Sequence, residues 1–259
     1  MDLGKISDYP QEAVGAAMSA LRNAGITSLE VQAAVLATIA KESRFVPKSE
    51  QSYSGTANAR IRSIFGNRVK DLTDDQLNVL KANPIAFFDH IYGNRYGNTN
   101  VGDGYKYRGR GLNQITFKAN YKAIGDVIGV DLVSNPDLLN TPTIAAKAAA
   151  AYFVIFFKIG KSSGKLQEKL GVSDVNEIKD TTTAVKAAIM ANAGWETNFE
   201  TSIVQEGFNK AMDTVQVFKN AVVNTASSVA KKVGDNSGVA SLLFFLASQQ
   251  LVISIVSLS

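Results

Sequence analysis

The stretch SLEVQAAVLATIAKES, residues 28–43, decides the fold class, because its small and apolar side chains recur at helical spacing. Val31, Val35 and Thr38 share one face of the predicted helix, and Ser28 can cap its first turn through a side-chain oxygen. The pattern therefore predicts a core helix over Leu29–Ser43. The stripe of core-facing positions ends at Glu42.

Glu42 has two interpretations from its position alone. A carboxyl group at the end of an apolar stripe is partly desolvated, which raises its pKa and makes it a candidate proton donor near neutral pH. Alternatively, the side chain extends into water at the last turn or pairs with the neighbouring Lys41. Both interpretations stay open at the level of sequence.

The rest of the chain predicts a mainly α protein with little or no sheet. Six glycines between residues 93 and 111 predict a loop whose backbone can approach a ligand closely. Helices are expected where small and apolar residues repeat between caps and breakers. These segments are Gln11–Asn23, Leu29–Ser43, residues 59–65, Asp71–Ala82, Pro84–Tyr92, Ile144–Phe157 and Thr181–Asn192.

The composition argues against several classes of site. The chain has 259 residues, no cysteine, and His90 as its one histidine, so a thiolate site is excluded and a zinc site is disfavoured. We expect no metal and no organic cofactor. The first residues lack the apolar core of a secretory signal, so no signal peptide is expected.

Positive charge is concentrated in two segments. Residues 41–70 carry seven Lys or Arg against two Glu, and residues 95–122 carry six against one Asp, so each has a balance of +5. Such segments suggest a groove for an anionic polymer, although charge runs are also common on solvated faces. Because no reading helix or aromatic-rich sheet accompanies them, we expect no nucleic acid partner.

The stretch GDGYKYRGRGLNQITFKANY, residues 102–121, carries the most specific signal. It resembles glycoside hydrolase family 19, the chitinase-like lysozymes, and especially phage endolysins of that family, whose signature is aromatic-x-Gly-Arg-Gly-x-x-Gln-Ile/Leu-Thr/Ser-x-x-x-Asn-Tyr. Every specified position matches between Tyr107 and Tyr121. Segments upstream and downstream also resemble the family, so that the likeness extends from about Gln11 to Phe218.

The resemblance implies a lysozyme-like or chitinase-like helical domain with a catalytic groove. It assigns the general acid to Glu42, the second carboxylate to Glu50, and to Thr116 the hydroxyl that helps to hold the attacking water. The expected substrate-binding or site-shaping residues are Tyr107, Arg110, Gln114, Asn120, Tyr121 and Asn192.

Some of these assignments have a structural alternative. Arg110 is equally well explained as an arginine that bonds loop carbonyls, and Tyr107 as a packing residue. Trp195 is more typical of a core than of a sugar platform. Gln114 lies in an otherwise apolar segment, which favours a functional role because a buried amide needs partners.

The chain departs from the family pattern at three places. Lys41 stands where many relatives have His before the acid. Arg44 replaces a pair of glycines, so the segment between Glu42 and Glu50 is one residue shorter than in the family pattern. Ala193 replaces the first glycine of an Asn-Gly-Gly sequence. These positions lie beside the expected catalytic residues.

The predicted function is hydrolysis of β-1,4 bonds in peptidoglycan glycan strands by a two-carboxylate inverting mechanism, in phage lysis or as part of a virion. A lytic transglycosylase and a chitinase are the enzymatic alternatives. A non-catalytic wall-binding or structural virion protein is the alternative from another class. The expected location is the host cytoplasm before release to the periplasm and cell wall, or the virion.

The end of the chain has a different composition. Residues 1–219 are expected to form the catalytic domain, and residues 220–259 a linker followed by an uncharged apolar tail. That tail is long enough to cross a bilayer as a helix, but its β-branched residues also suit a packed strand. Residues 236–259 are therefore predicted to contact a membrane or a phage structural partner.

Overall fold

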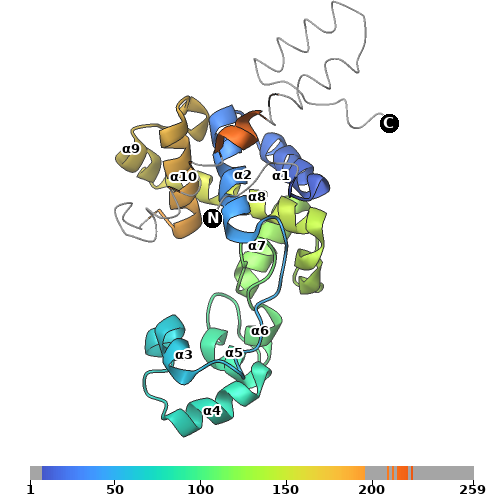
Figure 1. The fold of residues 1–259 in the computed structure, drawn as a ribbon, viewed down its shortest axis with the longest axis vertical. Helices are drawn as coiled ribbons and strands as arrows, with labels where there is room; N and C mark the ends of the chain where they lie inside the picture. Colours follow the sequence, from blue (N-terminus) through green and yellow to red (C-terminus); the bar gives the residue numbers. More distant parts are fainter. Residues whose placement is uncertain (1–7, 196–208, 210–211, 213–214, 221–222, 224–259) are drawn as a thin grey trace, which may run out of the picture. The chain divides into compact units, whose positions relative to one another are not determined.

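The described part of the computed structural model is mainly α-helical (Figure 1). It comprises residues 8–195, 209, 212, 215–220 and 223. In these residues β pairing is limited to two isolated bridges, Arg95 with Asn98 and Arg110 with Ile115. The predicted fold class is therefore confirmed. The predicted linker and tail, apart from Asn220 and Val223, lie outside the described residues.

The chain divides into two compact units, each described here by itself. Unit 1 contains residues up to Phe45 and from Ala150 onward, and unit 2 contains Val46–Ala149. The α-helices are α1 (Gln11–Asn23), α2 (Leu29–Ser43), α3 (Asn58–Phe65), α4 (Asp74–Ala82), α5 (Pro84–Tyr92), α6 (Asp103–Lys106), α7 (Lys118–Ile128), α8 (Pro142–Ser162), α9 (Lys165–Leu170) and α10 (Thr181–Ala193). Short 3-10 helices span Gly66–Arg68, Pro136–Asn140 and Val175–Glu177.

Unit 1 is built on the packing of α2 against α10, which lie side by side in Figure 1. Every residue of α2 from Val31 to Ala40 is buried. Small side chains on α10 allow this close approach, since Ala184, Ala187 and Ala188 are completely buried. The helix predicted from residues 28–43 thus has the predicted bounds, with the Ser28 side chain accepting a hydrogen bond from the Val31 N–H.

The turn after α2 is anchored by an aromatic cluster. Phe45 is fully buried, and its ring lies 5.6 Å from that of Tyr9 and 6.1 Å from that of Phe218. Arg44 and Phe45 both adopt left-handed backbone conformations, with φ of 51° and 58°. Non-glycine residues pay a steric penalty there, so the turn depends on the buried Phe45 ring for its conformation.

Unit 2 has a core of its own made from α3, α4 and α5 with the segments between them. Its buried members are Ile61, Val69, Leu77, Phe87, Phe88 and Ile91. Tyr53 and Tyr92 pack against this core while staying partly exposed. The core therefore presents two phenol groups at its surface.

Local capping sets where the helices of unit 2 begin. Thr73 forms a capping box with Gln76, so α4 starts at Asp74 and not at Asp71 as predicted. Asn83 accepts hydrogen bonds from the Ile85 and Ala86 N–H groups and begins α5. In unit 2, helices α6 and α7 were not predicted, because the glycines in and around them favour a loop.

Helix α8 is longer than the predicted Ile144–Phe157. In the described residues it is also the one helix long and apolar enough to cross a membrane by length and composition. More than half of its most apolar stretch is buried inside the protein, as is usual for a core helix. Within unit 1, Gly160 of α8 lies against the Trp195 indole, and the Trp195 Nε1–H donates to the Phe156 carbonyl at 2.8 Å. Trp195 is buried, as predicted.

This contact predicts opposite effects for the same substitution in two helices. A Cβ at Gly160 would lie 2.7 Å from the indole, whereas a Cβ at Gly15 of α1 meets nothing within 4 Å. Gly15→Ala should stabilise the protein by about 0.5–1 kcal/mol through helix propensity. Gly160→Ala should destabilise it by about 1–3 kcal/mol through overpacking. Chemical denaturation measures both values, and equal shifts in the same direction would contradict the described Trp195 packing.

Candidate functional site

Glu50 is held by three hydrogen-bond donors within unit 2. The Tyr53 hydroxyl donates to Oε1 at 3.0 Å, and the Tyr92 hydroxyl lies 3.0 Å from Oε1 and 3.1 Å from Oε2. The Gly109 N–H donates to Oε2 at 3.2 Å. Both carboxylate oxygens are therefore engaged, which fixes the orientation of the group.

The two tyrosines are suited to remain donors. Burial raises the pKa of Tyr92 and of Tyr53 well above the ordinary value, and the negative charge of Glu50 raises both further. A phenol with a raised pKa keeps its proton over the whole range in which proteins are folded. Both phenols can therefore act as hydrogen-bond donors to Glu50.

The backbone around Glu50 is pinned to the glycine-rich loop. The Glu50 N–H donates to the Gly109 carbonyl at 2.7 Å, and Arg108 Nε donates to the Glu50 carbonyl at 3.1 Å. Gln114 Nε2 donates to the Lys48 carbonyl at 2.9 Å. A Cβ at Gly109 would lie 2.8 Å from Gln114 Oε1 and 3.3 Å from Glu50 Oε2, so a larger residue would have to displace one of these side chains. The residues around the Gly-Arg-Gly stretch thus position the Glu50 carboxylate.

Glu42 has different surroundings in unit 1. It is exposed at the end of α2, where it forms an ion pair with Lys41 and accepts a hydrogen bond from Asn192 Nδ2 at 3.2 Å. Its side chain keeps 33% of its surface exposed, so the expected partial desolvation stays a prediction. The alternative, pairing with Lys41, agrees with the structure, because the last turn of α2 has left the core.

Three residues of the signature are accessible in unit 2. The Thr116 hydroxyl is half-exposed and donates to the Gln114 carbonyl at 3.0 Å, while Asn120 Nδ2 donates to the Thr116 carbonyl at 2.8 Å. Gln114 is exposed rather than buried, and has a left-handed backbone with φ of 51°. Its amide already bonds Lys48 and Gly111 carbonyls, so its role here is to position the Glu50 loop.

Tyr107, Arg110 and Tyr121 are buried, with 1%, 3% and 0% of their surface exposed. The predicted direct contact of these residues with substrate does not agree with this burial. Arg110 donates to the Lys106 carbonyl and the Tyr121 hydroxyl and pairs with Asp137 at 2.8 Å. The Tyr107 hydroxyl donates to the Val133 carbonyl at 3.1 Å. They shape the loop from within, which corresponds to the structural alternatives.

Sequence reasoning missed Tyr53 and Tyr92 as partners of Glu50. Tyr53 lies three residues after Glu50, and Tyr92 ends a predicted helix, so neither spacing indicates a shared carboxylate. Asn98 was also missed, although it is completely buried and bonds the Tyr92 carbonyl and the Lys118 N–H. Its neighbours in the chain are largely polar, so the sequence gives no signal that this amide is the buried one.

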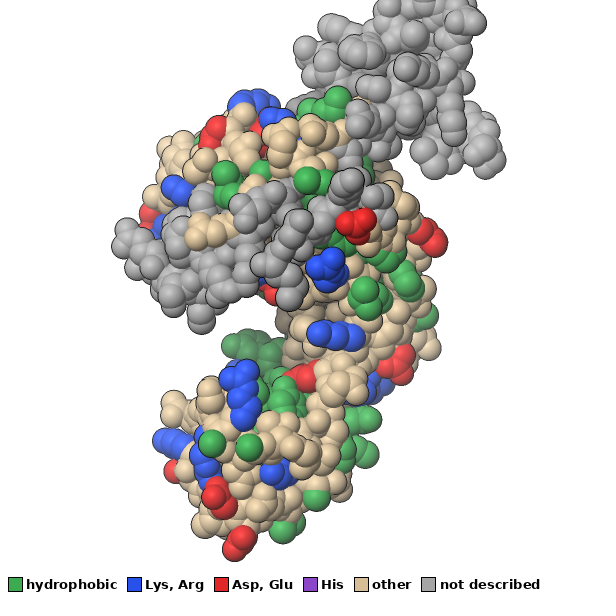
Figure 2. Space-filling model, in the orientation of Figure 1, with side chains coloured by type: hydrophobic (Ala, Val, Ile, Leu, Met, Phe, Trp, Pro, Cys, Tyr) green, Lys and Arg blue, Asp and Glu red, His purple; other side chains and the backbone are tan. Residues whose placement is uncertain are grey.

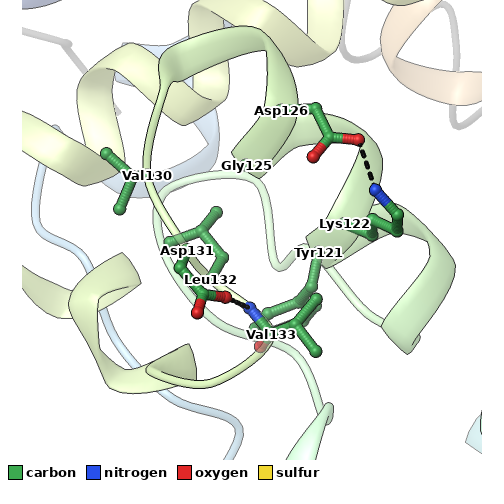
Figure 3. Close-up of a pocket in the computed structure, with 8 residues that line it drawn as sticks. All are labelled: Tyr121, Lys122, Gly125, Asp126, Val130, Asp131, Leu132 and Val133. Carbon is green, nitrogen blue, oxygen red and sulfur yellow. Dashed lines mark hydrogen bonds and ion pairs between the residues drawn. The ribbon is translucent and has the colours of Figure 1, made fainter.

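A pocket of about 260 Å³ lies elsewhere in unit 2, along α7 and the following turn (Figure 3). Its polar side chains are already engaged, since Lys122 pairs with Asp126 at 2.8 Å and Asp131 accepts from the Val133 N–H at 3.1 Å. The pocket contains none of the predicted catalytic residues. No group of three potential metal ligands occurs among the described residues.

The comparisons bear on part of this site. Residues 89–169 match the family model described as chitinase class I, of glycoside hydrolase family 19. A glycosyl hydrolase family 19 domain-containing protein of Haemophilus influenzae is 42% identical over 72 residues, covering 27% of this chain and 36% of that protein. Chitinase 11 of Oryza sativa is 47% identical over 47 residues, 18% of each chain, and endochitinase 1 of Theobroma cacao is 55% identical over 47 residues, 18% of this chain and 15% of that one.

The chain thus spans between 15% and 36% of the length of these curated relatives. The family match contains the signature and Tyr92, but Glu42, Glu50 and Asn192 lie outside it. The resemblance predicted from Tyr107 to Tyr121 is confirmed, and residues 89–169 match the chitinase-like glycoside hydrolase family 19.

Proposed function

We propose that the protein is a glycoside hydrolase that cleaves β-1,4 bonds between N-acetylated amino sugars with Glu42 as general acid and Glu50 as general base. The observation that carries this proposal is the seat of Glu50, in which two hydroxyls and one backbone N–H hold both carboxylate oxygens. A base that activates water needs an ionised carboxylate in a fixed orientation. The family match supports the reaction class.

The proposed mechanism uses the two carboxyl groups in different protonation states. Glu42 donates a proton to the leaving oxygen, while Glu50 takes a proton from the water that attacks the opposite face of the sugar, so that the configuration inverts. The exposed position of Glu42 lets it exchange protons with solvent between turnovers. Asn192 and Lys41 orient its carboxyl group, and the accessible Thr116 hydroxyl contacts the water.

For the substrate, we propose the glycan strand of peptidoglycan. Its peptide stems carry carboxylates, and unit 2 has an excess of Lys and Arg around the Glu50 loop. Figure 2 shows basic and hydrophobic side chains side by side on the visible surface of α3–α6. The likeness to phage members supports a bacteriolytic role in this proposal.

Chitin is the second candidate substrate. It is favoured by the names of the matching plant relatives, which are chitinases and endochitinases. Chitin is an uncharged polymer of the same β-1,4-linked amino sugar that alternates in peptidoglycan. The two substrates are therefore distinguished by charge and not by the bond that is broken.

The proposed mechanism makes a prediction about the two carboxylates. Glu42→Gln and Glu50→Gln should each lower the rate of hydrolysis by about 10²–10⁴-fold, because each removes one proton-transfer group. Mass spectrometry of digested peptidoglycan and of chitin oligosaccharides measures the products. Reducing-end products are expected from the wild type, and proton NMR in the first minutes of reaction should show the inverted anomeric configuration.

Matched controls remove carboxylates elsewhere. Glu12→Gln on α1 and Asp75→Asn on α4 change exposed groups outside the site and should leave the rate unchanged. Formation of 1,6-anhydro products with a fully active Glu50→Gln variant would replace the hydrolase by a transglycosylase. Absence of products on both polymers, with binding retained, would support the non-catalytic wall-binding role.

The second prediction concerns Tyr92. Tyr92→Phe removes the hydroxyl that contacts both oxygens of Glu50, and it should lower kcat about tenfold, since one hydrogen bond to a charged group is worth roughly 1.5–3 kcal/mol. KM should change less than kcat, because the hydroxyl acts on the base and not on the sugar. Steady-state kinetics on a soluble oligosaccharide measures the two values.

Tyr53→Phe and Tyr105→Phe provide the comparison for that variant. Tyr53 contacts one oxygen of Glu50, so its loss should have a smaller effect on kcat. Tyr105 packs on the same core, but its hydroxyl is not among the Glu50 contacts, and Tyr105→Phe should keep full activity. A kcat for Tyr92→Phe equal to that of Tyr105→Phe would argue against the role of Glu50 as the base.

A further inference from the structure

Tyr96 presents an aromatic ring to solvent beside the signature loop of unit 2. Its surface is 64% exposed, although large aromatic side chains usually bury most of theirs. The ring is supported from one side by Phe117, with the ring centres 4.9 Å apart and an interplanar angle of 60°. Tyr96 is therefore held in place while most of its surface stays exposed.

The backbone beneath this ring is strained and fixed. Tyr96 and Phe117 have φ of 42° and 76°, a conformation that bulky side chains rarely adopt. The Ala119 N–H donates to the Tyr96 carbonyl at 3.0 Å, and a Cβ at Gly97 would lie 3.2 Å from the Ala119 nitrogen. The Tyr96 loop is thus bonded to the start of α7 and packs closely against it.

Asn98 completes this lock. Its buried side chain donates to the Tyr92 carbonyl at 3.0 Å and accepts from the Lys118 N–H at 2.9 Å. One amide therefore joins the loop that carries Tyr96 to the start of α7. The exposed ring stands on a rigid base, which limits the entropy lost when a ligand binds to it.

The same contacts lead directly to Glu50. The Phe117 ring lies 5.5 Å from the Tyr92 ring at an interplanar angle of 83°, and the Tyr92 hydroxyl bonds the Glu50 carboxylate. Phe117 also follows Thr116 in the chain. The open ring of Tyr96 and the proposed base therefore belong to one continuous aromatic assembly within unit 2.

Arg95 adds a positive charge to this assembly. Its guanidinium lies 5.3 Å from the centre of the Tyr96 ring and 5.3 Å from that of Phe117. In the described part of the chain no carboxylate pairs with Arg95, so its N–H groups remain available to an anion. A guanidinium stacked on two rings is well placed for a planar carboxylate.

We propose that Tyr96 and Arg95 form a subsite in which the Tyr96 ring stacks on an N-acetylated sugar of the glycan and Arg95 binds a carboxylate of its peptide stem. This subsite rests on the proposed function and makes it more specific. The aromatic face recognises the apolar face of a sugar ring, which chitin and peptidoglycan share. The arginine recognises the anionic group that peptidoglycan alone carries.

The experiment measures direct binding by the full chain in a Glu42→Gln background, so that the ligands are not consumed. Isothermal titration is done with chitotetraose and with a muropeptide tetrasaccharide that keeps its peptide stems. Tyr96→Asn removes the ring while suiting the left-handed backbone, and Tyr96→Phe keeps the ring. Arg95→Gln removes the charge, and Val79→Asn on α4 makes a similar change at an exposed site outside the assembly.

Tyr96→Asn should weaken the binding of both ligands roughly three- to tenfold, and Tyr96→Phe and Val79→Asn should leave it unchanged. Arg95→Gln should weaken the muropeptide about threefold and leave chitotetraose unaffected. Amide NMR spectra of each variant verify the fold.

Unchanged affinity of Tyr96→Asn, with active wild-type enzyme, would overturn the subsite and leave the proposed hydrolase standing. An equal loss of both ligands in Arg95→Gln would overturn the carboxylate contact. Turnover of the same ligands by the wild type, followed in parallel, separates these results from failure of the proposed function. A wild type that binds through Tyr96 but cleaves neither ligand would retain the subsite and reject the hydrolase.

Discussion

The carboxylate of Glu50 and its donors form the interaction on which the candidate site depends. A charged group at the edge of a core is stable only when its oxygens are satisfied, and here phenols from that core supply the hydrogen bonds. Tyr53 and Tyr92 have their rings in the apolar cluster and their hydroxyls on Glu50. The packing of unit 2 therefore also positions the proposed base. A change that loosens the core would weaken the hydrogen bonds to the carboxylate.

The two proposed catalytic carboxyl groups receive their properties from opposite surroundings. Glu50 is fixed by uncharged donors at the edge of an aromatic cluster, whereas Glu42 is partly exposed and pairs with the cation of Lys41. A group that must gain and lose protons in each cycle benefits from access to water, and a group that must stay ionised benefits from fixed donors. The chemical difference between the two thus follows from helix termination in unit 1 and core packing in unit 2.

Much of the fold was predictable because it depends on local signals. Ser28, Asn83 and the periodicity of residues 28–43 set helix bounds that the structure reproduces. The surroundings of the site were less predictable, since Tyr92 and Glu50 are 42 positions apart in the chain and meet only through tertiary packing. For Arg110 and Tyr107 the signature indicates a role in the site. It does not indicate that both side chains are buried and support the loop from inside.

Backbone strain in the described residues is concentrated where the chemistry is expected. The non-glycine residues with positive φ are Arg44, Phe45, Asn94, Tyr96, Gln114 and Phe117. Two follow Glu42 closely, two follow Tyr92, and two flank Thr116. Each such residue costs on the order of 1–3 kcal/mol and persists only where surrounding contacts fix it.

Phe45 is fixed by burial, Gln114 by its two carbonyl contacts, and Phe117 by the rings around it. Glycine or asparagine adopts this conformation at the lowest cost, and Asn94 is the one such residue among the six. Of the other five residues, Tyr96 keeps a large ring 64% exposed, so its strained backbone serves to present that ring to solvent rather than to bury it.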